Sequence, residues 1–329
     1  MTDPVAPGSP HRDPAGETTR ALLDSRLLMV TGKGGTGKTT YAASLALLSA
    51  VRGKRTLLCE LDSQRPALKP IFGVDPTYAP VRVRDNLDLC NVTWPDALNQ
   101  FLTNIVPSRR VIGLVTQNRM VSKFLDFTPG SQEIVTLSAL ADHVGGYDLV
   151  VADMPASGHA FSLLDITRSA LGLFRSGPVR TRATELRTLL AKPSTRMALV
   201  ALPEEMVVNE TIETHHRLAK YELVSRPPMV FLNRATLPTL TADERTLLAR
   251  LSEQWLPPLQ AEFVRAGRWE DELEQATADS RYRLAAAFGE EPVLVPPAPP
   301  GGIAQQVCES VSVHLGRLVG LTRRELQWS

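Results

Sequence analysis

The sequence is poor in cysteine, in aromatic side chains and in net charge. Its 329 residues include three cysteines, 5% aromatic residues and a formal net charge of +1. The cysteines, Cys59, Cys90 and Cys308, lie far apart without C-x-x-C spacing, which argues against a zinc or iron–sulfur site and fits a reducing cytoplasm. A nearly neutral chain gives no electrostatic case for wrapping nucleic acid, so we expect no nucleic-acid partner.

Long apolar runs are also missing. No stretch reaches the length and apolarity of a membrane-spanning helix, and we expect at most peripheral membrane contact. The chain through about Glu17 is rich in proline, glycine and threonine and lacks the apolar core of a signal peptide, which predicts a disordered tail over residues 1–20. By length alone the remaining residues 21–329 could form two domains or one large α/β domain.

The chain does contain a series of short apolar runs separated by helical patterns. Several runs are continuous and do not alternate, which is typical of parallel strands covered on both faces. The pattern predicts an α/β fold with a doubly wound, mostly parallel sheet. The predicted strands are Leu27–Val30, Thr56–Cys59, Leu149–Ala152, Met197–Leu202, Met229–Leu232 and Val293–Val295, and Asn86–Val92 is predicted as an edge strand.

Two intervals, about 94–143 and 161–192, are longer than simple crossovers require. Their apolar residues follow helical spacing, and we predict a helical subdomain formed by these insertions at one end of the sheet. They hold more large apolar residues than a small helical layer usually hides, so part of this surface is expected to be an exposed groove. Further on, Thr241–Glu244 forms a capping box that starts a helix, and Ile303–Leu321 is expected to be a closing helix.

The segment Gly32–Thr39 follows the first apolar run and matches G-x-x-x-x-G-K-[ST] at every fixed position. Glycines let backbone N–H groups approach phosphates at a helix N-terminus, where the helix dipole favours negative charge. Lys38 is predicted to lie against the β- and γ-phosphates, and the Thr39 hydroxyl to ligate Mg²⁺. The predicted nucleotide contacts of this loop are Gly32, Lys33, Gly34, Gly35, Thr36, Gly37, Lys38, Thr39 and Thr40.

A buried strand ends in Asp153, and in a phosphate-binding loop fold such a carboxylate normally holds Mg²⁺. The alternative is an ordinary aspartate between strand and loop. The turn that follows contains Gly158, whose backbone N–H could sense a γ-phosphate. These positions predict that Thr39 and Asp153 are the protein ligands of the metal.

Two further strand ends carry polar side chains. Asp62 follows Thr56–Cys59 and could orient or deprotonate an attacking water, with Glu60 as a competing candidate and a solvated loop aspartate as the alternative. Asn233 ends another strand, and its amide offers a donor and an acceptor that suit the edge of a purine. An asparagine that caps a turn is an equally good interpretation.

These motifs resemble a known family. Gly32–Thr40 resembles the deviant Walker A motif of SIMIBI-class P-loop NTPases, in which Lys33 stands at the place of the signature lysine. Asp153–His159 resembles the D-x-x-x-x-G-H switch II of the arsenite-pump and tail-anchored protein targeting ATPases, and Pro129–Glu133 resembles their P-G-x-x-E element. The resemblance runs from about Leu27 to Leu321 and is greatest to bacterial members of that family.

The resemblance implies a cytoplasmic P-loop ATPase that uses ATP and Mg²⁺. It implies that Lys33 reaches across a dimer interface to the partner's phosphates, and that Asp62 is the switch I aspartate that positions water, so that Asp62, Lys33 and Lys38 are the expected catalytic residues. Asn233 and Val295–Pro297 fall where the adenine-contacting elements lie. In eukaryotic relatives the helical insertions build an apolar groove for a transmembrane helix across the dimer.

The sequence departs from the family pattern at several places. Switch I reads Asp62–Pro66 where the family commonly has D-P-A-H, and Ser157 stands where switch II usually has threonine. The zinc-binding C-x-x-C of eukaryotic dimers and a cysteine trio suited to arsenite are both missing. These departures leave open how fast the chain turns over nucleotide and which client it takes.

The function expected from these motifs is a Mg²⁺-dependent ATPase that acts as a nucleotide-gated dimeric switch for hydrophobic or tail-anchored membrane-protein clients. The dimer could be a homodimer or a heterodimer with a paralogue. Alternatives are a positional ATPase of the septum-site or partition type, an arsenite-stimulated transport subunit, and a slowly hydrolysing regulatory partner in a heterodimer.

Overall fold

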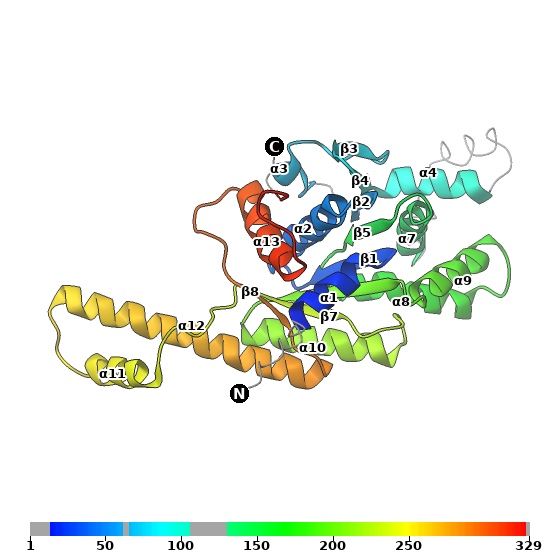
Figure 1. Ribbon diagram of the computed structural model, residues 1–329. Helices are drawn as coiled ribbons and strands as arrows, with labels where there is room; N and C mark the ends of the chain where they lie inside the picture. The colour runs from blue at the N-terminus through cyan, green and yellow to red at the C-terminus, as the bar shows by residue number, and fades with distance from the viewer. Residues whose placement is uncertain (1–13, 62–65, 106–129, 327–329) are drawn as a thin grey trace, which may run out of the picture.

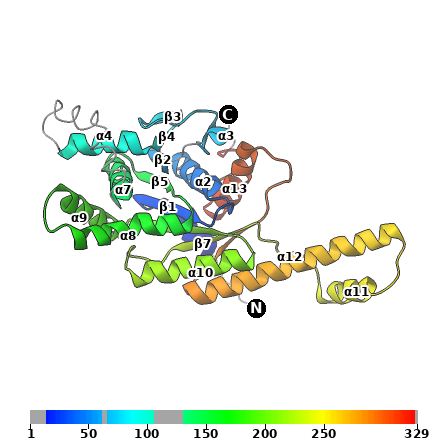
Figure 2. The same ribbon diagram turned by 180° about the vertical axis from the view of Figure 1, so that it is seen from behind.

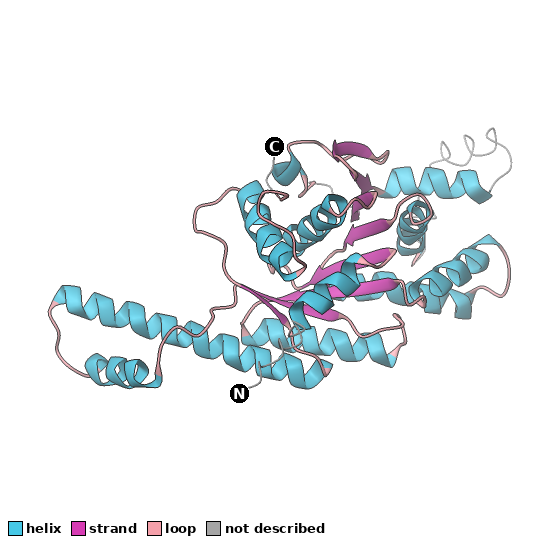
Figure 3. Ribbon diagram, viewed as in Figure 1, coloured by secondary structure: helices cyan, strands magenta, loops and turns pink. Residues whose placement is uncertain are grey.

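The computed structural model describes residues 14–61, 66–105 and 130–326. Within these ranges the chain forms one eight-stranded sheet in the order β3-β4-β2-β5-β1-β6-β7-β8, with helices on both faces (Figures 1 and 3). The strands are β1 (Leu27–Gly32), β2 (Thr56–Leu61), β3 (Val81–Arg84), β4 (Leu87–Val92), β5 (Leu149–Asp153), β6 (Thr195–Ala201), β7 (Met229–Asn233) and β8 (Val293–Val295).

The strands run parallel except β3, which pairs antiparallel with β4. The predicted doubly wound, mostly parallel α/β fold is therefore confirmed. The placement of Asn86–Val92 at the edge is wrong, because β4 lies between β2 and β3 and its residues are mostly buried. The strand at this edge of the sheet, Val81–Arg84, alternates valine with arginine and is partly exposed, so it lacks the apolar run that marks the other strands.

Successive residues of each strand face two separate apolar layers. In β1, Leu28 and Val30 pack with one layer and Leu27 and Met29 with the other. Because both faces are covered, the strand reads as an unbroken apolar run. The first layer holds α1 (Pro14–Leu23), α2 (Lys38–Val51), the short α3 (Lys69–Phe72) and α13 (Ala304–Leu318).

The second layer holds α4 (Trp94–Ile105), α7 (Ser131–His143), α8 (Ser157–Leu173), α9 (Pro178–Leu190) and α10 (Glu205–Lys220). The first four come from the two predicted insertions and pack on one another. Most of their described apolar side chains are buried, whereas Leu173 and Phe174 at the end of α8 are exposed. The part of the first insertion that carries Val111 to Leu125 lies outside the described residues.

Helix α1 corrects the expected extent of the N-terminal tail. Residues 14–20, predicted to be disordered, lie in this helix. Pro14 begins it, a position that tolerates a missing N–H, and Leu22 and Leu23 at its end are fully buried against the layer that contains α2 and α13. The burial of these two leucines supplies the packing energy that a polar composition alone would not provide. Residues 1–13 lie outside the described part.

Helix α13 packs into the core along α2, and its residues Cys308, Val311 and Leu315 are buried. The predicted closing helix is confirmed, although it ends at Leu318. Its apolar face is thus covered by the protein's own core. In the described ranges, no helix combines the length and apolarity that crossing a bilayer requires.

The sequence did not predict the most prominent feature outside the sheet. Helices α11 (Ala242–Ser252) and α12 (Pro258–Phe288) form a hairpin that projects away from the body, while the C-terminal part of α12 lies along α10 (Figures 1 and 2). We call this hairpin the arm. The predicted capping box at Thr241 and Glu244 is confirmed; α11 ends at Ser252, and Trp255 lies exposed in the connection between the two helices.

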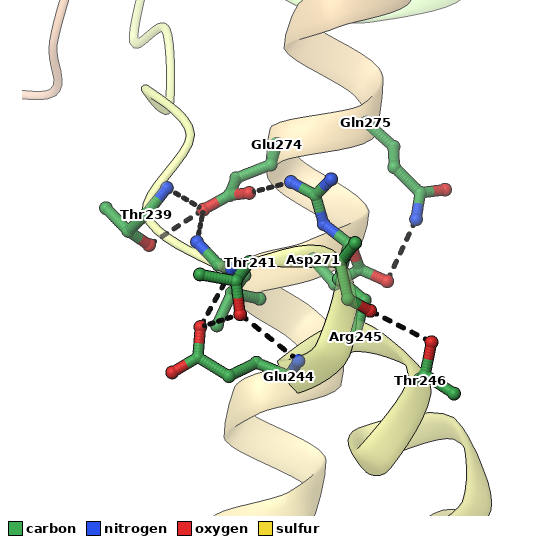
Figure 4. A network of polar contacts seen from close by, with 10 residues as sticks. Thr239, Thr241, Glu244, Arg245, Thr246, Asp271, Glu274 and Gln275 are labelled. Carbon is green, nitrogen blue, oxygen red and sulfur yellow. Dashed lines mark hydrogen bonds and ion pairs between the residues drawn. The ribbon is translucent and has the colours of Figure 1, made fainter.

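A polar network holds the base of the arm together (Figure 4). The Glu274 carboxylate accepts hydrogen bonds from Thr239 N at 2.6 Å, Thr239 Oγ1 at 2.7 Å, Leu240 N at 3.2 Å and the Arg245 guanidinium. Asp271 lies 3.0 Å from Arg245 Nε in an ion pair. Burial opposes ionisation of Glu274, but these donors outweigh it and lower its pKa to about 2. The network therefore fixes α11 and residues 239 and 240 to α12.

Candidate functional site

The predicted phosphate loop joins β1 to α2 at the edge of the sheet where the parallel strands end. Two of its glycines are required by their surroundings. Gly32 has φ 151°, and a Cβ there would lie 2.2 Å from the carbonyl oxygen of Val200 on β6. Gly37 has φ 99°, and a Cβ there would lie 2.9 Å from Asn233 Nδ2 on β7. The loop is therefore seated closely on the ends of two neighbouring strands.

The loop closes around one carbonyl group. The backbone oxygen of Lys33 accepts hydrogen bonds from Thr36 Oγ1 at 2.9 Å and from Lys38 Nζ at 3.2 Å, and the Thr36 N–H lies 3.4 Å away. Burial lowers the pKa of Lys38, an effect that Asp153 and Glu210 oppose through their negative charges. A partly buried ammonium group gains most from a further anion, and a phosphate in the loop would supply it.

Two helices begin at this edge of the sheet. No side chain of the described residues caps α2 at Gly37 or α8 at Ala156. Thr40 lies in the first turn of α2, and Gly158 lies exposed in the first turn of α8. Uncapped N-termini carry unpaired N–H groups and the positive end of the helix dipole, which together favour an anion.

Thr39 and Asp153 meet across the site, as the sequence predicted for a pair of metal ligands. Thr39 Oγ1 donates a hydrogen bond to Asp153 Oδ2 at 2.6 Å, and no group among the described residues bonds Asp153 Oδ1. Asp153 is 7% exposed. Burial raises its pKa to about 7, the Thr39 hydrogen bond and Lys38 lower it, and the charge of Glu60 raises it further.

This donor set fits Mg²⁺. The ion prefers oxygen ligands and usually takes one or two from the protein and the rest from phosphates and water. A buried carboxylate oxygen without a partner and an adjacent hydroxyl group supply two such ligands. Within the described ranges no cluster of three or more His, Cys, Asp or Glu side chains forms a site for a metal held by protein ligands alone.

Glu60, considered for the water-positioning role, has a structural contact. Its Oε1 accepts a hydrogen bond from Ala67 N at 2.5 Å, and its side chain is buried at the end of β2. It thereby ties the chain after β2 back to the strand. Asp62, the other candidate, lies outside the described residues, as does Pro129 of the P-G-x-x-E element. Their assigned roles stay predictions.

Asn233 lies at the end of β7 with both halves of its amide engaged. Its Nδ2 donates to the carbonyl of Thr36 at 2.8 Å, and its Oδ1 accepts from Arg234 N at 2.9 Å. The side chain thus supports the phosphate loop, although Asn233 and Thr36 are 197 residues apart in the sequence. The amide keeps a second N–H and a second lone pair on Oδ1 that could contact a purine, and that role stays a prediction.

Sequence reasoning missed Glu210 on α10. Its Oε2 lies 3.7 Å from Lys33 Nζ, and its Oε1 accepts a hydrogen bond from Ser157 Oγ at the start of α8. Lys33, predicted to reach a partner subunit, is thus turned toward its own chain. A glutamate in a helix, 177 positions beyond its lysine partner, leaves no local pattern, and only the placement of α10 beside the loop reveals it.

The structure therefore brings together Lys33, Lys38, Thr39 and Asp153 at one edge of the sheet. Loop glycines and Asn233 hold the arrangement, and Gly158 lies at the start of the neighbouring helix. This is the chemistry of a site for a polyphosphate with a divalent cation: helix N-termini, two lysines and a buried carboxylate with an unused oxygen.

Comparison with known proteins supports this description. Residues 25–175, from the start of β1 through α8, match the family model described as anion-transporting ATPase. The protein named ATPase BagA of Mycobacterium tuberculosis is 30% identical over 223 residues, which cover 61% of this chain and 63% of that protein. An uncharacterized protein of Streptomyces coelicolor is 31% identical over 208 residues, or 60% and 51% of the two chains.

A third relative carries a more specific name. A protein of Aquifex aeolicus, provisionally named arsenical pump-driving ATPase 2, is 26% identical over 188 residues, which cover 54% of this chain and 62% of that protein. In each case the chain spans less than two thirds of the relative's length.

Proposed function

We propose that this chain, whose residues 25–175 match the family model described as anion-transporting ATPase, is a Mg²⁺-dependent ATPase that works as a nucleotide-gated dimeric switch. The observation that carries the proposal is the Thr39–Asp153 pair, with its unpartnered buried carboxylate oxygen beside the phosphate loop. A merely structural aspartate at this depth would be expected to satisfy both oxygens.

The chain's own residues account for binding and orientation. Backbone N–H groups at the start of α2 and the Lys38 ammonium would grip the phosphates, and Lys38 would exchange its bond to the Lys33 carbonyl for a phosphate oxygen. Mg²⁺, held through Thr39 and Asp153, would neutralise charge on the β- and γ-phosphates. The orientation of the attacking water is assigned to Asp62 from the sequence alone.

The dimer part of the proposal is supported by Lys33. The loop needs only one lysine for the phosphates, and Lys33 has a half-exposed side chain that pairs with Glu210 at 3.7 Å. Such a pair is weak enough to open, because half-exposed ion pairs contribute little free energy. We therefore propose that Lys33 completes the site of a second subunit, identical or paralogous, once nucleotide is bound.

Exposed apolar side chains support a hydrophobic client. They lie on the arm and its connection, and they include Leu247, Trp255, Leu259, Phe263 and Trp269. Apolar side chains gathered on a projecting element are more typical of partner binding than of an idle surface. A tail-anchored membrane protein is the client class that we propose.

The relatives' association with arsenical pumps finds less support in this chain. Its three cysteines are fully buried; Cys59 and Cys90 lie 3.0 Å apart between β2 and β4, and Cys308 packs in α13 on the other side of the sheet. They offer no accessible trio of thiols for a trivalent arsenic compound, so we propose the hydrophobic client and not arsenite.

Two measurements on the full-length chain test the proposal. ATP hydrolysis should require Mg²⁺ and stop in EDTA. Size-exclusion chromatography with light scattering should give a monomer in ADP and a dimer in a γ-phosphate analogue. ATP hydrolysis that is unaffected by EDTA would contradict the magnesium site, and a monomer in both nucleotides would contradict the homodimeric switch.

The client is tested separately with a tail-anchored peptide and a matched peptide whose apolar segment is replaced by serine and glycine. We expect capture of the first peptide only, and a dependence of capture on the nucleotide. Equal capture of both peptides, or capture of neither, would contradict the proposed client and would leave the proposed ATPase activity unaffected.

A further inference from the structure

Glu210 lies where the phosphate loop and the segment after Asp153 approach each other. One carboxylate oxygen is 3.7 Å from Lys33 Nζ in the loop, and the other accepts a hydrogen bond from Ser157, whose side chain is buried at the start of α8. A single side chain on α10 therefore contacts both segments that would respond to a γ-phosphate.

The position of this carboxylate is unfavourable for the proposed ligand. Its negative charge acts on Lys38 as well as on Lys33, so it already partly neutralises the two ammonium groups near which a polyphosphate would bind. A like charge beside an anion site weakens anion binding. Glutamine would keep the hydrogen bond from Ser157 without that cost, so the charge itself calls for an explanation.

We propose that Glu210 is a positioning residue that holds Lys33 against its own chain until a triphosphate binds. This proposal rests on the proposed function. The negative charge of the bound triphosphate repels Glu210, the ion pair with Lys33 opens, and the freed ammonium can reach a second subunit. Since Ser157 stays bonded to Glu210, the same carboxylate transmits the change to the first turn of α8, where Gly158 lies.

The direct test needs no nucleotide. The full-length chain is treated with an amine-acylating ester, and the rate of Lys33 modification is followed by mass spectrometry in the wild type, in Glu210→Gln and in Glu213→Gln. Glu213 lies exposed one turn further along α10 and controls for the lost charge. We expect Lys33 in Glu210→Gln to react about two to five times faster, the range for breaking a half-exposed ion pair. Equal rates in Glu210→Gln and Glu213→Gln would overturn the proposal.

A second variant probes the link to α8. Ser157→Ala removes the hydroxyl group that orients Glu210, and circular dichroism checks that the chain is folded. Lys33 should then react faster than in the wild type but less fast than in Glu210→Gln. A Lys33 rate unchanged from the wild type would contradict the coupling between Ser157 and the lysine.

Nucleotide binding gives the functional readout. With Mg²⁺ present, Glu210→Gln should bind a non-hydrolysable triphosphate about fivefold more tightly than the wild type and should gain less for ADP, while Glu213→Gln matches the wild type. The difference should shrink at about 1 M salt, where such charges are screened. If the wild type binds no nucleotide, the proposed function fails, and the acylation rates still decide the role of Glu210.

Discussion

Replacing Asp153 by asparagine should make the nucleotide-free protein more stable while it removes the metal site. The carboxyl group is 7% exposed, and its pKa is raised from 3.8 to about 7, chiefly by burial. An acid whose pKa is higher in the folded than in the unfolded state binds its proton more tightly when folded. The stability that this proton binding gives the folded state is fully present below about pH 3.8 and is lost as the pH rises through 7.

The size of the effect follows from that difference. At about 1.4 kcal/mol per pH unit, ionisation of Asp153 costs the folded state about 4 kcal/mol above pH 8, an upper limit because the surroundings relax. Asparagine keeps an oxygen that can accept the Thr39 hydroxyl. We therefore expect Asp153→Asn to raise the free energy of unfolding by about 2–4 kcal/mol at pH 8 and by less than about 1 kcal/mol at pH 4.

Urea denaturation in EDTA, followed by circular dichroism at several pH values, measures this difference. Other groups titrate in both chains, so only the difference between variant and wild type is used. A second series with Mg²⁺ and ATP should reduce the variant's advantage at pH 8, since about 100-fold saturation stabilises the wild type by about 2.7 kcal/mol and the variant much less. A variant that is no more stable than the wild type at pH 8, or a difference that does not change with pH, would refute the reasoning.

Three other substitutions, one of them with a matched control, have defined outcomes. Lys38→Met should lower the affinity for ATP at least about 100-fold in a fluorescent-nucleotide titration, because the loop loses a charge-assisted bond worth about 3 kcal/mol. Gly37→Ala should lower the free energy of unfolding by about 1–3 kcal/mol in thermal denaturation, because φ is 99° and the new Cβ would lie 2.9 Å from Asn233 Nδ2. The control Gly34→Ala places its Cβ in open space and should change stability little. Glu274→Gln should lower the free energy of unfolding by about 2–3 kcal/mol at pH 7. Because the pKa of Glu274 is lowered to about 2, the wild type keeps this stability above about pH 4.5 and loses it as the pH falls toward 2. The variant should not show that loss in an acid titration.

The parts of the structure that the sequence predicted are those encoded locally. The phosphate loop is a contiguous motif, and the strands of a doubly covered parallel sheet read as unbroken apolar runs, so the sequence alone indicates both. The Thr39–Asp153 contact was also within reach, because Asp153 ends β5, the loop that leads to Thr39 begins at the end of β1, and these two strands proved to be neighbours.

Other parts had no such signal. Helix α12 buries Asp271, Glu274, Thr277 and Ser280 along one face, so its pattern of apolar residues does not mark a packed helix. The polar network of the arm replaces the apolar stripe on which periodicity arguments depend. Glu210 and the Asn233 amide act through contacts between distant segments, and neither the identity of the residue nor its neighbours in sequence indicates the partner.

The hydrogen bond between Asn233 and Thr36 connects the phosphate loop to the strand end from which the chain continues into the arm. The chain passes from Asn233, which grips the loop, through residues 234–241 directly into α11, and Glu274 clamps the end of that passage to α12. We therefore expect the arm to rotate about a pivot near Asn233, beside the phosphate loop. A rotation of about 10° at the pivot displaces a point about 20 Å along the arm, roughly 14 helical residues, by about 3.5 Å, which is close to the width of one methyl group. The tip that carries Trp255 is where so small a movement at the loop would be largest.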